Sequence, residues 1–355
     1  CPNGVIDLRT GRLMKAHPGL LMTKRVPVDY VEGARLPAWD RFVSEVTGGD
    51  EEVAGFLQRF LGYGLAGTSR EDKFVICIGH GGSGKTTLLE SVRSAVGDYG
   101  VTIDFSTFLA GRNPGAIRSD IARLAGARLA ISTEGNPHDV IDLALLKKLT
   151  GRDRIAARPL YHEEFEFMPM FTLVLSTNHL PYLDPLDTGI WRRCIAVPFT
   201  NVVKHVDTSL RETLTSSREA KQAVLAWLVK GCTNWLKRGL DIPRSIVRYT
   251  ESYHANIDPV YCFVRDECVR GDTFRTLSRV LWNAYLSWSG GEPRLTRNEF
   301  AERLKRHHGC KFGRAKIDGK VERVIKGIAL RNGVQDSTAI EEVEWGWASS
   351  DAVDA

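Results

Sequence analysis

A glycine-rich loop between an apolar strand and a helix places the strongest constraint on what this chain can fold into. Residues Phe74–Ile78 are uniformly apolar, as in a strand buried on both faces of a parallel sheet. They lead into Gly79–Thr87, which fits G-x-x-x-x-G-K-[ST] at every fixed position, and an apolar helical stripe follows from Leu88 to Val96. This order predicts a P-loop in an α/β core.

The predicted loop offers three kinds of phosphate contact. Its glycines let backbone N–H groups turn toward phosphate oxygens, Lys85 adds a positive charge at the β and γ phosphates, and the Thr86 hydroxyl can take a Mg²⁺ ligand position. The start of the following helix adds its positive dipole end. We therefore predict a nucleoside triphosphate with Mg²⁺ bound by Gly79, Gly81, Gly82, Ser83, Gly84, Lys85, Thr86 and Thr87.

Two later strands are predicted to end in polar side chains that could act on the γ-phosphate. The apolar segment 127–134 ends in Glu134, 49 residues after Lys85, and we expect this strand to lie beside the P-loop. A carboxylate there can activate the attacking water or hold the Mg²⁺ shell. Segment 171–176 leads to Asn178, which can position that water and sense the γ-phosphate, or can equally well begin a turn.

Adjacent arginines precede a further apolar strand. Arg192 and Arg193 follow Trp191 and come just before the segment 194–199. A guanidinium stabilises the charge that spreads over a transferring phosphoryl group, so both residues are candidates for an arginine finger. A salt bridge or a DNA contact is the alternative role.

A dense basic block lies between the two polar strand ends. Segment 146–162 is rich in Lys and Arg, contains a single Asp, and ends near Tyr161 and His162. Such a block suits a loop or hairpin that holds nucleic-acid phosphates while an aromatic ring stacks on a base. An ordinary solvated surface would have a similar composition.

Charge is distributed unevenly over the 355 residues, whose formal net charge is only +5. Segment 261–334 carries 16 Lys and Arg against 8 Asp and Glu, whereas 335–355 carries 6 acidic residues and no basic one. This pattern favours a polyanion partner for the first segment and a solvated, disordered end for the second. A charge excess of this size also occurs on ordinary surfaces.

The composition of the chain indicates where in the cell the protein is expected. The chain is 43% hydrophobic and 26% charged, with no apolar run long enough for a membrane span and no signal-peptide pattern. Its seven cysteines form no CxxC pair, so neither a disulfide framework nor a zinc site is expected. We predict a cytoplasmic protein without a membrane partner. Because the chain begins at Cys1, we expect it to be a fragment of a longer protein.

The flanking regions predict smaller units. Residues 4–8 suggest a strand followed by a turn, and helices are expected from Pro37 and along the apolar stripe Val53–Leu61. Near the other end, Thr296 and Glu299 form a capping-box pattern, and Asp318-Gly319 separates two strand-like segments, as in a hairpin.

Four features in this order resemble superfamily 3 helicases, specifically the helicase part of phage and plasmid primase-helicases related to the poxvirus enzyme. They are the P-loop, the strand ending in Glu134, the Lys-Lys-Leu-Thr-Gly-x-Asp block at 147–153 and Ser-Thr-Asn at 176–178. The resemblance covers nearly the whole chain. Residues 1–70 resemble the domain that precedes the ATPase in that family, and the region 243–329 resembles its C-terminal winged-helix part.

The resemblance implies a ring-shaped, usually hexameric ATPase with an AAA+-like core that tracks along single-stranded DNA. ATP would bind between subunits, with Arg192 or Arg193 acting on the neighbour's site. The family's pore hairpin maps to about 158–164, so the implied DNA contacts are Arg158, Tyr161 and His162, with Lys148 from the block as a further one. In many members of this family two acidic residues end the strand that carries the catalytic carboxylate (the Walker B motif), whereas here Thr133 precedes Glu134.

We therefore predict an α/β protein with an AAA+-like P-loop core. The expected divisions are a helicase-associated domain at 1–70, the ATPase core at 71–205, a helical connection at 206–260, a basic winged-helix-like domain at 261–334 and an acidic tail at 335–355. The expected function is that of an ATP-dependent DNA helicase of a phage, prophage or plasmid replication protein, acting on single-stranded and forked DNA in the host cytoplasm at replicating DNA. A primase or polymerase domain is expected upstream.

Rival functions remain for such a chain. The first is a DNA-binding initiator or loader whose ATPase switches an assembly without processive unwinding, and a forked-duplex assay separates it from a helicase. The second is a small-molecule kinase, which leaves the basic block and the basic C-terminal region unexplained. Stimulation of the ATPase by single-stranded DNA would eliminate the kinase.

Overall fold

A computed structural model describes residues 1–111, 118–132, 135, 140–185, 187–201, 208–290, 295–317, 320–333 and 344–345. The chain divides into two compact units, Cys1–Tyr253 and His254–Ala355. The expected parts 1–70 and 71–205 and most of 206–260 therefore lie in the first unit. Within the described part of the chain, no helix is both long and apolar enough to cross a bilayer.

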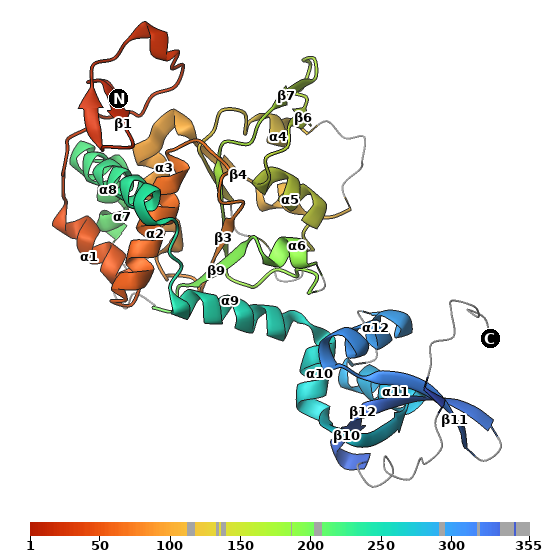
Figure 1. Cartoon of the computed structure of the whole chain (residues 1–355). Helices are drawn as coiled ribbons and strands as arrows, with labels where there is room; N and C mark the ends of the chain where they lie inside the picture. Colours follow the sequence, from red (N-terminus) through yellow and green to blue (C-terminus); the bar gives the residue numbers. More distant parts are fainter. Residues whose placement is uncertain are drawn as a thin grey trace. The chain divides into compact units, whose positions relative to one another are not determined.

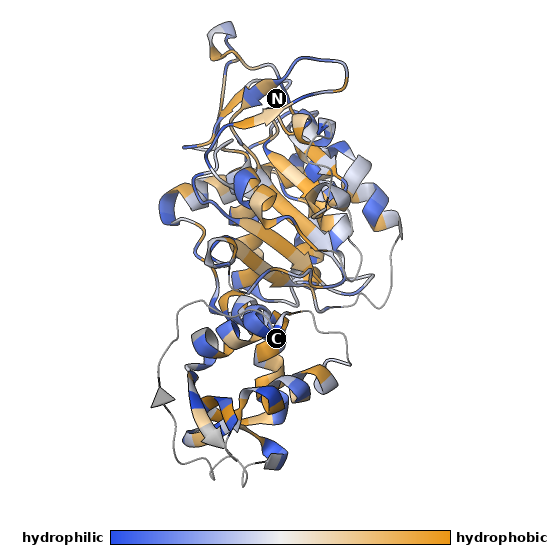
Figure 2. Cartoon of the chain, turned by 90° about the vertical axis from the view of Figure 1, so that its right-hand side faces the viewer, coloured by the Kyte–Doolittle hydropathy of each residue, from blue (hydrophilic) through white to orange (hydrophobic). Residues whose placement is uncertain are grey.

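A parallel sheet of five strands forms the centre of the first unit. Its order is β4 (Gly100–Ile103), β5 (Leu129–Ser132), β8 (Thr172–Thr177), β3 (Phe74–Ile78) and β9 (Cys194–Pro198). Strands β3, β5 and β8 are buried along their whole length, which explains their unbroken apolar character. Figure 2 shows the strands of this sheet coloured as hydrophobic.

The sheet order corrects one expectation. The strand that leads toward Glu134 is β5, and it does not lie beside the P-loop strand, because β8 is inserted between β5 and β3. The strand that leads to Asn178 is therefore the direct neighbour of the P-loop strand. Chain order could not reveal this insertion, because only hydrogen-bonded pairing decides which strands are neighbours.

Helices cover both faces of the sheet (Figure 1). Helices α2, α3, α7 and α8 lie on one side and α4, α5 and α6 lie on the other. Their bounds are α2 Glu51–Gly64, α3 Lys85–Val96, α4 Ser119–Ala122, α5 Leu143–Thr150, α6 Thr188–Trp191, α7 Thr208–Ser216 and α8 Arg218–Arg238. Short 3₁₀ turns occur at Gly97–Tyr99 (η2) and Phe105–Phe108 (η3).

The N-terminal segment packs onto the same core. A hairpin of β1 (Val5–Asp7) and β2 (Arg12–Met14) is followed by a 3₁₀ turn η1 (Pro18–Leu20) and helix α1 (Pro37–Val46). The expected strand and turn and the expected helix start at Pro37 are thus confirmed. The stripe from Val53 to Leu61 is buried in one cluster that also contains residues of α3, α8 and the central sheet.

Helices α2 and α8 approach each other closely at two glycines. A Cβ atom added at Gly231 would lie 1.9 Å from the carbonyl oxygen of Gln58, and one at Gly62 would lie 2.4 Å from that of Leu228. Real Cβ atoms do not approach backbone atoms this closely, so the two helix axes can keep their separation only while both positions lack a side chain.

Replacing Gly231 with alanine should therefore lower the free energy of unfolding by about 3 kcal/mol, because the two helix backbones must move apart. Chemical denaturation followed by circular dichroism measures the change. Gly55→Ala is the matched control in α2, since its added Cβ meets only the end of the Arg59 side chain, at 3.2 Å. Equal stability of Gly231→Ala and the wild type would contradict this packing.

Helix α9 (Arg244–Ile257) runs from the end of the first unit into the second. The second unit contains α10 (Pro259–Glu267), β10 (Cys268–Leu277), α11 (Ser278–Trp288), α12 (Arg297–His308), β11 (Lys311–Ile317), β12 (Lys320–Leu330), η4 (Arg331–Gly333) and β13 (Glu344–Trp345). Its antiparallel sheet has the order β10-β12-β11-β13.

The predicted features of this unit are largely found. The capping box of Thr296 and Glu299 opens α12. Strands β11 and β12 pair as an antiparallel hairpin, with Ile317 opposite Lys320, while the predicted turn residues Asp318 and Gly319 lie outside the described residues. The core of the unit is aromatic-rich and includes Phe263, Tyr285 and Phe300.

Candidate nucleotide and nucleic-acid sites

The P-loop joins β3 to α3 through a backbone that requires glycine. Gly82 and Gly84 have φ values of +80° and +83°, in the left-handed region that costs a residue with a Cβ atom free energy. A Cβ at Gly79 would lie 2.2 Å from the carbonyl oxygen of Phe199, and one at Gly84 would lie 2.3 Å from Cγ1 of Val46. The loop is therefore held between the end of β9 and the last turn of α1.

Lys85 is the first residue of α3, and its ammonium group lies at the centre of the loop. Its Nζ donates to the carbonyl oxygens of Gly79 at 2.6 Å and His80 at 3.2 Å, and to Ser83 Oγ at 3.2 Å. It also donates to Oδ1 of Asn178 at 3.0 Å. The structure thus brings together two predicted site residues that are 93 positions apart in the sequence.

The remaining loop residues differ in exposure. Gly81, Gly82 and Thr86 are exposed, Gly79, Gly84 and Thr87 are half-buried, and Ser83 is buried. The Thr86 hydroxyl is therefore accessible in the first turn of α3, where a Mg²⁺ ligand would be expected. Mg²⁺ commonly takes only one or two protein ligands beside phosphate oxygens and water, so this donor set fits the ion.

Cys77 lies on β3, just before the loop. Burial raises the pKa of this cysteine to about 12, so its thiol remains neutral.

The ends of β5 and β8 are tied together near the loop. Ser132 Oγ, at the end of β5, accepts a hydrogen bond from the backbone N–H of Ser176 at 3.1 Å. Asn178 follows β8 directly and is half-buried. Thr133 and Glu134 lie outside the described residues, so the structure gives no position for the predicted general base.

The two candidate finger arginines lie at the opposite end of the sheet from the P-loop. They precede β9, whose first residue Cys194 is paired with Phe74 at the start of β3, whereas the loop follows Ile78. A five-residue strand spans about 15 Å, so neither arginine can reach the phosphate site of its own chain. Arg192 is exposed, whereas Arg193 is half-buried and its Nε and Nη1 atoms lack hydrogen-bond partners among the described residues.

The segment that carries these arginines is held in place by contacts that the sequence analysis did not predict. Lys73 Nζ donates to the carbonyl oxygen of Arg192, and burial lowers the pKa of Lys73. Trp191 Nε1 donates to the carbonyl oxygen of Asp184 at 2.9 Å, and its ring lies 5.0 Å from that of Tyr253. No local pattern marks these contacts, because each one joins separate elements.

An ion pair links this segment to the predicted basic block. Lys147 Nζ, on α5, donates to Oδ2 of Asp187, the residue that caps α6, at 2.7 Å. Burial is the largest single influence and acts to raise the pKa of Asp187, but the hydrogen bond and charge of Lys147 and the nearby backbone N–H groups together outweigh it, so the pKa lies below its ordinary value. Lys148, one position later, is exposed.

The predicted pore segment forms the tip of a hairpin between β6 (Ile155–Ala157) and β7 (Phe165–Phe167). Within it, Arg158 Nε donates to the carbonyl oxygen of His162 at 2.9 Å, so both predicted contact residues also shape the loop. Tyr161 has a φ of +62° and is 90% exposed, and Leu160 beside it is 53% exposed. The hairpin therefore presents an aromatic ring to solvent from a backbone closed by its own hydrogen bonds.

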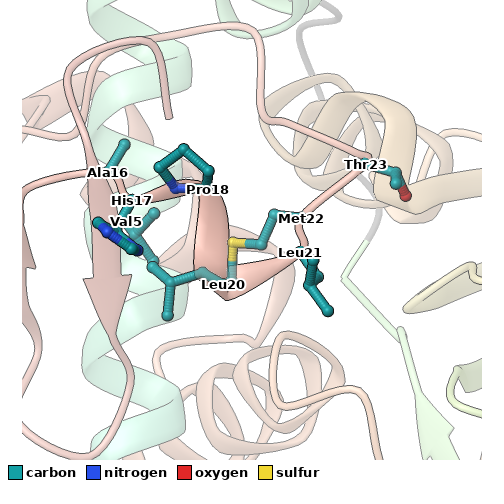
Figure 3. A pocket seen from close by; sticks show the side chains of 8 residues that line it. All are labelled: Val5, Ala16, His17, Pro18, Leu20, Leu21, Met22 and Thr23. Atoms are coloured by element: carbon teal, nitrogen blue, oxygen red, sulfur yellow. The ribbon is translucent and has the colours of Figure 1, made fainter.

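Three hollows found on the first unit lie away from the P-loop. One of about 480 Å³ is lined by Val5 and by residues of segment 16–23 (Figure 3). His17 and Met22 are among its lining side chains, and none of its lining residues belongs to the loop. In the portion that the structure describes, no group of three or more His, Cys, Asp or Glu side chains could hold a metal ion.

Comparisons with known families match three separate parts of the chain. Residues 1–48 match a family described as "D5 N terminal like", and residues 255–329 match one described as "Poxvirus D5 protein-like". Residues 77–193, which include the P-loop, match a family described only as one of unknown function.

Viral proteins are similar over much of the chain. A protein provisionally named a helicase in Acanthamoeba polyphaga mimivirus is 28% identical over 76% of this chain and 30% of its own length. One provisionally named a helicase in frog virus 3 is 28% identical over 68% of this chain and 26% of its own length. One provisionally named a primase in African swine fever virus is 28% identical over 35% of this chain and 13% of its own length.

A solved structure shares the fold. The apo C-terminal region of NrS-1 superposes with a TM-score of 0.52 at 14% identity, covering 86% of this chain and 79% of that one. At this identity the likeness concerns the fold alone. The chain spans about 30% or less of the length of the curated viral relatives named above.

Proposed function

Because the chain belongs to the D5-like primase-helicases of the superfamily 3 type, we propose that it is an ATP-dependent DNA helicase motor. One observation carries the proposal. Lys85 Nζ, inside the P-loop, lies 3.0 Å from Oδ1 of Asn178 at the end of the neighbouring strand. That contact brings a positive charge and a polar amide together beside the loop, which supports our proposal that both residues act on the γ-phosphate.

The P-loop residues would bind the triphosphate of ATP. Lys85 would exchange its contacts with the loop carbonyls and Asn178 for contacts with phosphate oxygens, and Thr86 would hold Mg²⁺. A bound Mg²⁺ neutralises charge on the phosphates. Asn178, released from Lys85, would orient the attacking water, and Glu134 would accept its proton.

The arginines before β9 would act on the ATP of a neighbouring subunit. Both lie at the far end of the sheet from their own P-loop, so a role in hydrolysis requires a second copy of the chain. We propose a ring of such copies, with six as the number that the resemblance implies. Exposure favours Arg192 for the contact across the interface, and Arg193 would then support the segment from its half-buried position.

The β6–β7 hairpin would hold single-stranded DNA in the ring. Tyr161 offers a ring face for base stacking, which is worth about 1–3 kcal/mol per base. Arg158, His162 and Lys148 would contact phosphates. Hydrolysis would move the hairpin and draw one strand of a forked duplex through the ring.

An unwinding assay on a forked duplex tests this function and excludes a loader that does not unwind. The wild type should separate the strands, whereas Tyr161→Ala should lose unwinding at least about tenfold and lose DNA stimulation of its ATPase, because one stacking contact is gone. Basal ATPase should persist. Tyr161→Phe keeps the ring and serves as the control. Unwinding by Tyr161→Ala at the wild-type rate would remove the hairpin from the mechanism.

We propose that the second unit is a winged helix. Its order of helix, strand, two helices and two strands, from α10 to β12, and its sheet order β10-β12-β11 support that proposal. We further propose that the intact protein carries a primase or polymerase domain upstream and works in the host cytoplasm at replicating DNA of a virus, phage or plasmid.

A further inference from the structure

One connection of the chain joins the predicted sensor to the candidate finger arginines. It leaves the carboxyl end of β8, where Asn178 lies, and returns to the amino end of β9, which Arg192 and Arg193 precede. Because the strands are parallel, these two points lie at opposite ends of the sheet, about 15 Å apart along a strand. The connection 178–193 is therefore the direct covalent path from the sensor to the finger segment.

Helix α9 packs against the free edge of this sheet. Strand β9 is the last strand in the sheet order, and the backbone N–H of its Ala196 donates to Oγ1 of Thr250 at 3.0 Å. Ile246 and Tyr253 are the buried residues of α9, and Thr250 lies between them on the same helical face. This face of α9 is therefore the one that contacts the first unit.

Tyr253 contacts the connection at two points. Its hydroxyl donates at 2.5 Å to the carbonyl oxygen of Pro181, which is three residues after Asn178. Its ring lies 5.0 Å from that of Trp191, which directly precedes Arg192. Burial raises the pKa of Tyr253 well above its ordinary value, so the hydroxyl keeps the proton that it donates. One side chain thus holds both halves of the connection.

The two halves are also joined directly. Trp191 Nε1 donates to the carbonyl oxygen of Asp184 at 2.9 Å. Ile190, the residue before Trp191, is fully buried, so α6 is anchored in the core. Close-packed side chains leave little free space to absorb a displacement. A shift of the segment around Pro181 is therefore passed on to Trp191.

We propose that Tyr253 is a positioning residue that couples the nucleotide bound by one subunit to the arginine finger that this subunit offers to its neighbour. The inference rests on the proposed function, in which the finger acts on the neighbour's ATP. Asn178 accepts a hydrogen bond from Lys85, and bound ATP would take that donor and draw Asn178 to the γ-phosphate and its water. Tyr253 then carries the shift to Trp191 and engages Arg192. The nucleotide and the finger thus bias the same element, as coupling between two sites requires.

Tyr253→Phe tests the hydroxyl while it keeps the ring against Trp191. In the full chain, kcat for ATP hydrolysis should fall about fivefold while KM changes less than about twofold, because a hydrogen bond that positions the finger is lost and the P-loop is untouched. Tyr253→Leu, which also loses the ring contact, should lower kcat further. Tyr249→Phe is the matched control on α9, since the Tyr249 hydroxyl has no hydrogen bond among the described residues, and it should hydrolyse ATP normally.

Mixed rings separate coupling from a loss of stability. A Lys85→Ala subunit loses the charge that holds the phosphates, so at an ATP concentration near the wild-type KM it should neither hydrolyse ATP nor engage its finger. Hydrolysis should therefore fall more steeply than in proportion to the fraction of Lys85→Ala subunits. A Glu134→Gln subunit keeps its P-loop and its engaged finger, so the fall should only be proportional. In the Tyr253→Phe background both falls should be proportional.

The outcomes keep this coupling apart from the proposed function. If Lys85→Ala and Glu134→Gln subunits lower hydrolysis alike in the wild-type background while unwinding is intact, the coupling is overturned and the helicase function stands. An equally steep fall with Lys85→Ala in the Tyr253→Phe background would leave Tyr253 a purely structural role and overturn the coupling as well. A wild type that does not hydrolyse ATP would refute the proposed function and the coupling together.

Discussion

Replacing Lys85 with alanine should lower the rate of ATP hydrolysis at least about 100-fold and abolish unwinding, because the loop loses the one charge at its centre. The ammonium group donates to acceptors on Gly79, His80, Ser83 and the predicted sensor Asn178. Hydrolysis is measured as phosphate release with and without single-stranded DNA.

The fold should survive this change. Lys85 is buried, but its partners include two loop carbonyl oxygens, a hydroxyl and a side-chain amide oxygen, all of which water can reach once the side chain is removed. Circular dichroism and the oligomeric state should therefore match the wild type. Lys237→Ala, which removes an exposed charge from α8, should hydrolyse ATP normally. Unwinding retained by Lys85→Ala would refute the mechanism.

Mixing two inactive variants should restore activity if the active site is shared between subunits. Glu134→Gln removes the proposed base, and Arg192→Ala with Arg193→Ala removes the proposed finger, so each homogeneous ring should lose about 1000-fold in hydrolysis. In mixed rings, some interfaces combine the two variants. There the arginine variant supplies an intact P-loop and base, and the Glu134→Gln variant supplies the intact arginines. Phosphate release should then rise well above that of either variant alone.

The distance along the sheet makes this test decisive. Both arginines precede the start of β9, whereas the P-loop follows the end of the neighbouring β3. A mixture no more active than its components would exclude action across an interface. Single replacements then assign the role: Arg192→Ala should reproduce most of the loss, and Arg193→Ala should reduce thermal stability because its half-buried side chain contributes packing.

Local patterns were sufficient for the elements around the nucleotide site. An unbroken apolar run implies a strand covered on both faces, and glycine spacing before Lys85 implies a loop that only glycine can adopt. The capping box at Thr296 and the stripe from Val53 to Leu61 were read from chemistry within a few residues. All of these depend on contacts between near neighbours in the chain.

Pairing between strands that are distant in the sequence determines the strand order and which site residues lie close together. The insertion of β8 between β5 and β3 places Asn178, rather than the strand leading to Glu134, beside the P-loop. The same pairing puts the arginines of one chain out of reach of its own phosphate site, and it leaves β9 at the edge of the sheet, where Ala196 contacts Thr250 of α9. A sequence specifies which side chains can bind phosphate, but strand order and register arise from packing of the whole core. Only the folded chain therefore shows which of those side chains can act together.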